Sequence, residues 1–145
     1  MITPDKNVWG PILWSIMHIL ATKYKYNKQT QLFNIIFKKY IPNVIPCDNC
    51  LYHYNNFIKS NLLSPRNFAY NLYVFHDSVS KRNGINTHSN YQIYHTNYLN
   101  YNIKDVINLI NKLKNYFITV GKKNNAQQLN YFIGLLKINY KILVI

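Results

Sequence analysis

The chain has 145 residues, of which 48% are hydrophobic, and this length and composition are typical of one globular domain with a core of its own. No apolar run approaches the ~20 residues that cross a bilayer, and the first residues lack the pattern of a secretory signal, so we expect a cytoplasmic protein without membrane contact. The formal net charge of +13 comes largely from lysines that are scattered among Asn, Ile and Tyr rather than gathered in one stripe, which argues against nucleic-acid binding.

Apolar residues at helical spacing occupy the N-terminal part of the chain. They predict a first helix from Val8 to Tyr24, with Pro11 tolerated in its first turn, where a backbone N–H is not needed. A second helix is predicted to start at Thr30, a residue type that caps helices, and to stop before Pro42. Proline thus falls where helix boundaries are expected.

The two cysteines lie at the start of the third predicted helix. Pro46 fixes the entry to the segment CDNCLYHYNNFIKSNLL, residues 47–63, whose first turn carries both sulfur atoms. Ser64 or Pro65 opens a fourth helix, which Gly84 closes.

The C-terminal part contains further helical patterns. A polar and aromatic stretch after Gly84 predicts a loop and a short helix from Ser89. Helical spacing then predicts one helix from Ile103 to near Gly121 and a last one over residues 129–140. The closing KILVI is too short to assign to a strand or to a helix end.

No segment alternates convincingly between apolar and polar residues, so the expected fold class is all-α. We expect a four-helix bundle, a short fifth helix and a two-helix C-terminal extension packed on the bundle. The predicted division places the main domain at residues 1–100 and the extension at residues 101–145.

Cys47 and Cys50 are the only cysteines, and four interpretations of this CxxC compete. A thioredoxin-like site would require a strand before the motif and a βαβ pattern around it, and neither is visible. An inert pair would behave as two small apolar residues. A structural zinc site would need two further ligands, which could come from His53, His76, His88 or His95.

The fourth interpretation is a redox pair. A cysteine at a helix N-terminus meets unsatisfied backbone N–H groups and the positive end of the helix dipole, which stabilise its thiolate, and Cys47 has this position. The helical period brings Cys50 onto nearly the same face one turn later, close enough for a disulfide that exchanges with an incoming thiol. Such a pair needs an acceptor for its electrons.

Three segments, WGPILWSIMHILA, CDNC and FHDSVSKRNG, occur in the order and at roughly the spacing seen in the Erv/ALR family of FAD-linked sulfhydryl oxidases. The chain resembles this family from Val8 to about Tyr94, and is most similar in kind to the short members encoded by large DNA viruses. The matching residues are Trp9, Gly10, Trp14 and His18 in the first segment, Cys47 and Cys50 in the second, and His76, Asp77, Val79, Ser80, Lys81, Arg82 and Gly84 in the third.

The resemblance implies that FAD lies in a slot between the faces carrying Trp14 with His18 and His76 with Val79 and Ser80. It also implies that Cys50 is the cysteine beside the flavin, that Cys47 exchanges with the substrate thiol, and that oxygen is reduced to hydrogen peroxide. The resemblance further implies that His53 tunes the thiolate. Lys81 and Arg82, with the turn at Gly84, would contact the phosphates. Tyr91 or Tyr94, with Tyr94 preferred, would stack on the adenine.

The sequence also departs from the family pattern. Asp77 and Ser80 replace two asparagines, Pro11 replaces a frequent arginine, and no second CxxC serves as a shuttle. One further possibility is therefore a member that keeps the fold but has lost turnover. An alternative from a different class is a basic helical binding module with a Cys/His zinc site.

The partners implied by the resemblance are oxygen and a thiol-containing protein, such as a thioredoxin-like or glutaredoxin-like carrier. A homodimer is also implied, and it would be non-covalent because both cysteines are committed to the redox pair. For a viral protein, the compartment would be the host cytoplasm or the virion.

Overall fold

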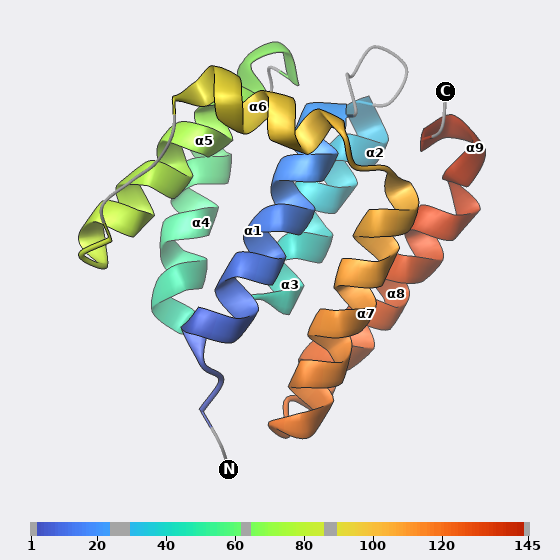
Figure 1. Ribbon diagram of the computed structural model, residues 1–145. Helices are drawn as coiled ribbons and strands as arrows, with labels where there is room; N and C mark the ends of the chain where they lie inside the picture. Colours follow the sequence, from blue (N-terminus) through green and yellow to red (C-terminus); the bar gives the residue numbers. More distant parts are fainter. Residues whose placement is uncertain (1–2, 24–29, 62–64, 86–89, 144–145) are drawn as a thin grey trace.

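The computed structural model describes residues 3–23, 30–61, 65–85 and 90–143, and over these ranges its regular secondary structure is entirely helical (Figure 1). The prediction of an all-α fold is confirmed. The elements in chain order are α1 (Lys6–Lys23), α2 (Thr30–Ile35), the π-helical η1 (Ile36–Tyr40), α3 (Ile41–Val44), α4 (Asp48–Asn61), α5 (Pro65–Arg82), α6 (Tyr91–Leu99), α7 (Ile103–Thr119), α8 (Lys123–Ile138) and α9 (Tyr140–Leu143).

Helix α1 starts two residues earlier than the sequence pattern predicted, because Asp5 caps it. The carbonyl of Asp5 accepts hydrogen bonds from the N–H groups of Val8 (2.9 Å) and Trp9 (3.1 Å), and its Oδ1 accepts one from the N–H of Asn7 (2.9 Å). Pro11 consequently lies inside the helix and not in its first turn, so that prediction is wrong. Pro11 has no N–H, so the carbonyl of Asn7 loses its usual partner four residues later.

Helices α2, η1 and α3 form one continuous helical run, and the prediction that it stops before Pro42 is wrong. The N–H of Ile41 donates to the carbonyl of Ile36, five residues back, in the wider π-helical pattern. In the same pattern the carbonyl of Phe37 would need the N–H of Pro42, which does not exist. The buried hydroxyl of Tyr54 fills this place by donating to the Phe37 carbonyl at 2.6 Å.

The later helices agree in kind with the predicted ones. Asn90 caps α6 by accepting from the N–H of Ile93 at 3.1 Å, and Asn102 forms a capping box with Asp105 at the start of α7. The closing segment is helical through Leu143. Four predicted boundaries, at Tyr24, Leu63, Ser64 and Ser89, lie outside the described residues.

Helix α1 is the centre of the molecule. Helices α4 and α5 lie on one side of it, α7 and α8 lie on the other, and α6 crosses near one of its ends (Figure 1). The side chains of Ile16 and Ile19 are completely buried as a result. The helix that carries the CxxC, α4, packs on α3, η1 and α5.

The C-terminal helices share this core. Helix α7 packs on α1, and α8 packs on α7, α3 and η1. Phe117 of α7 and Phe132 of α8 are completely buried in the same hydrophobic cluster as the residues of α1. The extension therefore packs on the bundle through one continuous core, while the division at residue 100 stays a prediction. Among the described helices, none has both the length and the apolar character needed to cross a membrane.

Candidate active site

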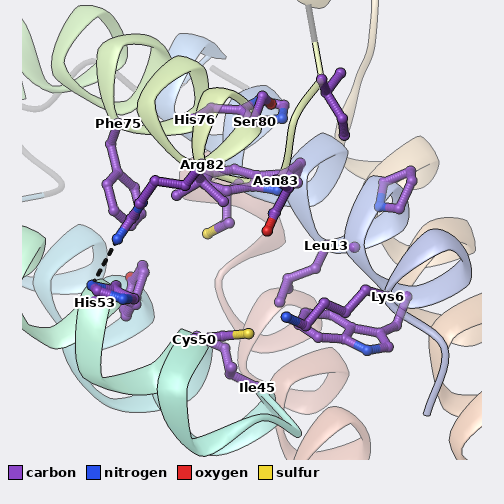
Figure 2. Close-up of a pocket in the computed structure, with 18 of the residues that line it drawn as sticks. Lys6, Leu13, Ile45, Cys50, His53, Phe75, His76, Ser80, Arg82 and Asn83 are labelled. Carbon is purple, nitrogen blue, oxygen red and sulfur yellow. Dashed lines mark hydrogen bonds between the residues drawn. The ribbon is translucent and has the colours of Figure 1, made fainter.

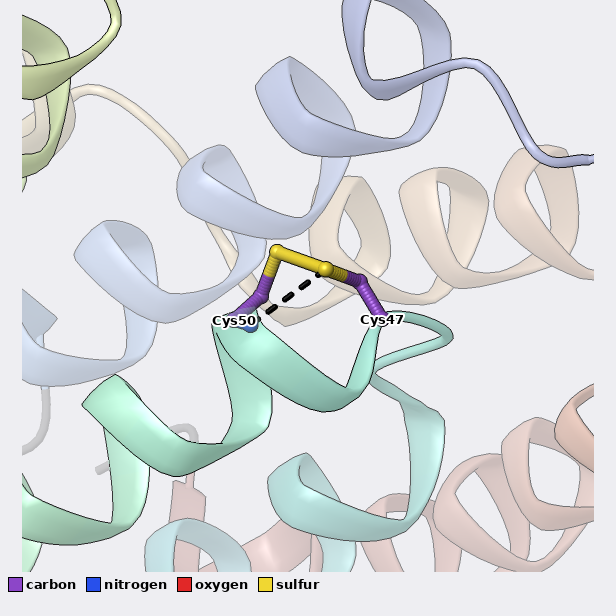
Figure 3. The surroundings of a disulfide bond; sticks show 2 residues. All are labelled: Cys47 and Cys50. Carbon is purple, nitrogen blue, oxygen red and sulfur yellow. Dashed lines mark hydrogen bonds between the residues drawn. A yellow bond between two sulfur atoms is a disulfide. The ribbon is translucent and has the colours of Figure 1, made fainter.

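The CxxC forms a disulfide at the start of α4 (Figure 3). Cys47 is the N-cap residue, because its carbonyl accepts the N–H of Leu51 at 2.9 Å. Its Sγ also accepts a hydrogen bond from the N–H of Cys50 at 3.3 Å, and the two Cα atoms are 5.2 Å apart. The geometry expected from the sequence, a sulfur pair across the first turn of a helix, is what the structure contains.

A cavity of about 700 Å³ lies between the N-terminal half of α1, the start of α4 and the end of α5 (Figure 2). Figure 2 shows the sulfur of Cys50 pointing into this cavity. Cys50 is one of its lining residues, whereas Cys47 is not. The other lining residues predicted from the sequence are Trp9, Gly10, Trp14, His53, His76, Val79, Ser80 and Arg82.

Stacked aromatic rings form the inner wall of the cavity. The rings of Trp14 and His76 are almost parallel, 7° apart, with centroids separated by 4.0 Å. His18 lies behind them, 1% exposed, and its Nε2 is 2.9 Å from Nδ1 of His76. The hydroxyl of Tyr94 is 3.1 Å from the same nitrogen. His18 and Tyr94 thus hold the His76 ring in position without lining the cavity themselves.

One edge of the cavity is basic. Arg82 at the end of α5 donates a hydrogen bond from Nη1 to Nδ1 of His53 on α4, at 2.9 Å, and both side chains line the cavity (Figure 2). Lys81, by contrast, pairs with Asp77 one turn earlier on α5, with 3.0 Å between Nζ and Oδ2. Neither Lys81 nor Asp77 lines the cavity.

Gly84 ends α5 in a Schellman motif. Its φ of 75° is in the left-handed region that glycine adopts without strain. The N–H of Gly84 donates to the carbonyl of Lys81 (3.1 Å) and the N–H of Ile85 donates to that of Ser80 (2.9 Å). Gly84 itself does not line the cavity, but the turn brings Ile85 to it.

Several lining residues were not among those predicted from the sequence. On α1 the helical period could have revealed them, because Lys6, Leu13 and Met17 follow the same face as Gly10 and Trp14 at intervals of three and four. Asn7 and Pro11 follow the same helical spacing, whereas the lining residues outside α1 depend on how the helices pack. The unpredicted lining residues are Lys6, Asn7, Pro11, Leu13, Met17, Ile45, Asn49, Tyr54, Phe75, Asn83, Ile85 and Tyr98.

The histidines considered as zinc ligands are not gathered around the CxxC. His53 bonds to Arg82, His76 is next to His18, and His95 is 3.2 Å from the hydroxyl of Tyr91. Over the described residues, no group of three or more His, Cys, Asp or Glu side chains could hold a metal ion. His88 lies outside the described residues.

Buried tyrosines around the site predict alkaline instability. Burial raises the pKa of Tyr54, Tyr94 and Tyr98 above the ordinary value of a phenol, and a hydrogen bond from Ser15 partly offsets the shift at Tyr98. The folded protein therefore holds these protons more tightly than the unfolded chain. We expect the free energy of unfolding to be insensitive to these groups below pH of about 10, the usual phenol pKa, and to fall as pH rises above it.

Far-UV circular dichroism in a pH series, followed together with tyrosinate absorbance, measures this loss. Ionisation of the buried fraction should coincide with unfolding. Complete ionisation of all tyrosines in a still-folded protein would contradict the burial of these hydroxyls.

Comparison with known proteins relates the chain to a family. A model of the Erv1/Alr family matches residues 11–99, more than half of the chain. The chain is also 28% identical over 92 residues to a protein of Invertebrate iridescent virus 6 named "Putative FAD-linked sulfhydryl oxidase 347L". That match covers 55% of this chain and 83% of the viral relative. No solved structure matches the chain.

Proposed function

The chain belongs to the Erv1/Alr family, and on this premise we propose that it is an FAD-linked sulfhydryl oxidase that forms disulfides in partner proteins. The observation that carries the proposal is the asymmetric position of the disulfide. Cys50 lines a cavity large enough for a cofactor, and Cys47 is joined to it without lining that cavity. One sulfur can therefore meet the cofactor while the other meets a substrate. The name of the viral relative supports the same reaction.

The residues that line the cavity fit a flavin dinucleotide. Trp14 and His76 supply a flat aromatic wall for an isoalloxazine ring, and Cys50 supplies the sulfur. Arg82 supplies a permanent positive charge for phosphate. Among the described residues that line the cavity there is no Asp or Glu whose charge would repel a phosphate. We propose that these residues hold FAD, and that His18, His53 and Tyr94 orient them.

The cysteines would act by thiol–disulfide exchange. A substrate thiolate attacks Sγ of Cys47, which forms a mixed disulfide and releases Cys50 as a thiolate into the cavity. A second substrate thiol attacks the substrate sulfur of this mixed disulfide, so the substrate leaves as a disulfide and Cys47 is released. The N–H of Cys50 and the positive end of α4 stabilise the Cys47 thiolate. Bound FAD would take the two electrons of the reduced pair and pass them to oxygen, giving hydrogen peroxide.

The electrons must come from outside this sequence, because Cys47 and Cys50 are its only cysteines. We therefore propose a thioredoxin-like or glutaredoxin-like protein as the thiol substrate. A homodimer and a cytoplasmic location stay predictions. The dimer would be non-covalent, since both sulfur atoms are bonded to each other.

Cofactor content and oxygen consumption test the proposed function. We expect the purified protein to be yellow, to release FAD on denaturation, and to consume oxygen in the presence of a dithiol. A flavin spectrum together with peroxide formation would support the full reaction. A colourless, zinc-containing protein would contradict the proposal. FAD without oxygen consumption would instead indicate a family member that has lost turnover, for which Asp77 and Ser80 are the first residues to test.

A further inference from the structure

The charged residues of the cavity differ from those that the sequence suggested. Lys6, the first residue of α1, and Arg82, the last residue of α5, line it, and the lining that the structure describes contains no acidic residue. In Figure 2 Lys6 and Arg82 lie on opposite sides of the cavity, and the Arg82 side chain runs to His53 of α4. Lys81, which was predicted to contact phosphate together with Arg82, is paired with Asp77 and does not line the cavity. The cavity therefore favours an anion, and over the described lining Lys6 and Arg82 supply the Lys and Arg charges.

Lys6 occupies a position that helix formation alone would disfavour. The positive end of the helix dipole repels a cation in the first turn, and the first turn of α1 contains no acidic residue that would offset it. The carboxylate adjacent in the sequence is that of Asp5, which caps the helix and accepts the N–H of Asn7. Asp5 does not line the cavity. A residue that destabilises its own helix is expected at a functional position, because its favourable interaction forms only when a ligand is bound.

A residue distant in the sequence contacts the backbone next to Lys6. The N–H of Asp5 donates a hydrogen bond of 2.7 Å to the hydroxyl of Tyr116, a residue of α7 that is 111 positions away. Lys6 and Tyr116 both lie outside residues 11–99, the part that the family model matches. Helix α7 thus holds the backbone immediately before the cation that lines the cavity.

We propose that Lys6 binds the pyrophosphate of the flavin dinucleotide together with Arg82, and that Tyr116 is its positioning residue. This proposal rests on the proposed function, since it requires that the cavity takes FAD. The pyrophosphate carries two negative charges, and a lysine ammonium and an arginine guanidinium on opposite sides of the cavity supply two positive ones. The C-terminal extension would in this way contribute to cofactor affinity without touching the cofactor.

Binding titrations with two flavins test the role of Lys6 without any measurement of activity. The flavin is first removed, and FAD or riboflavin is then titrated while flavin fluorescence is followed. For Lys6→Gln we expect about a tenfold weaker affinity for FAD, the usual value of one charge-assisted hydrogen bond, and an unchanged affinity for riboflavin, which has no phosphate. Lys6→Arg should keep most of the FAD affinity. The loss should shrink at high salt.

Two further variants make the test specific. Lys104→Gln removes the same charge from an exposed position of α7 outside the cavity and should leave both affinities unchanged. Tyr116→Phe should weaken FAD binding by roughly two- to threefold and leave riboflavin binding unchanged, in line with a modest hydrogen bond. An unaltered FAD affinity in Tyr116→Phe would overturn the positioning role.

An unchanged FAD affinity in Lys6→Gln, or an equal loss for riboflavin, would overturn the phosphate contact. A wild-type protein that binds neither flavin would overturn the proposed function itself, and that result would be evident before any variant is made.

Discussion

Replacing Cys50 with serine is expected to lower dithiol-dependent oxygen consumption by about a thousandfold or more, as the loss of a reacting nucleophile usually does. Cys50 is the sulfur that points into the cavity, and a hydroxyl can neither form the disulfide with Cys47 nor deliver its electrons. The cavity itself should remain intact, because serine is smaller than cysteine and the aromatic wall is untouched. Oxygen-electrode rates and the flavin spectrum of the same sample separate the two effects: the rate should disappear while the yellow colour stays.

Cys47→Ser and Tyr52→Phe complete this experiment. Cys47→Ser should also abolish turnover, because the substrate would have no disulfide to attack. Tyr52 lies on the same helix, is 63% exposed and does not line the cavity, so Tyr52→Phe should keep the wild-type rate. Oxygen consumption by Cys50→Ser at the wild-type rate would show that the CxxC is not the route of the electrons.

Local patterns explain most of what the sequence predicted correctly. Helical spacing identified several elements of the bundle, and the position of the CxxC at the start of a helix followed from Pro46 immediately before it. Two prolines inside helices, Pro11 and Pro42, were misjudged for reasons that are not local. Pro11 is internal because Asp5 caps the helix earlier, and Pro42 is tolerated because Tyr54 supplies the hydrogen bond that Pro42 cannot.

In the candidate site, too, local features could be predicted and contacts between helices could not. The motif residues Trp14, His76 and Cys50 do come together at one cavity. The Lys81–Asp77 pair has i, i+4 spacing within one motif and could be read from the sequence, whereas the partner of Arg82 could not, because it lies on another helix. Lys81 pairs with Asp77 within α5, whereas Arg82 reaches across to His53 of α4. Two adjacent basic residues therefore have different surroundings, and only one of them lines the cavity.

Truncating Phe117 to alanine is expected to cost about 3–5 kcal/mol of the free energy of unfolding. The Phe117 side chain on α7 is completely buried, in the cluster that also contains the residues of α1. Its removal would leave a cavity at the contact between the extension and the bundle. If the whole chain unfolds as one unit, urea denaturation followed by circular dichroism should show a single transition, displaced to lower urea, and the flavin signal should be lost in the same transition.

Ile118→Ala is the matched control, because the neighbouring side chain is 53% exposed and its truncation should change the free energy of unfolding by less than about 0.5 kcal/mol. These two variants also distinguish an extension that shares the core of the bundle from an extension that folds as an independent domain. In an independent domain, Phe117→Ala would unfold α7 and α8 at low urea while the bundle kept its flavin. The burial of Phe117 against the same cluster as α1 argues for coincident loss, since the face of α1 that α7 covers would otherwise be exposed to water. Two separate transitions in Phe117→Ala would contradict a shared core.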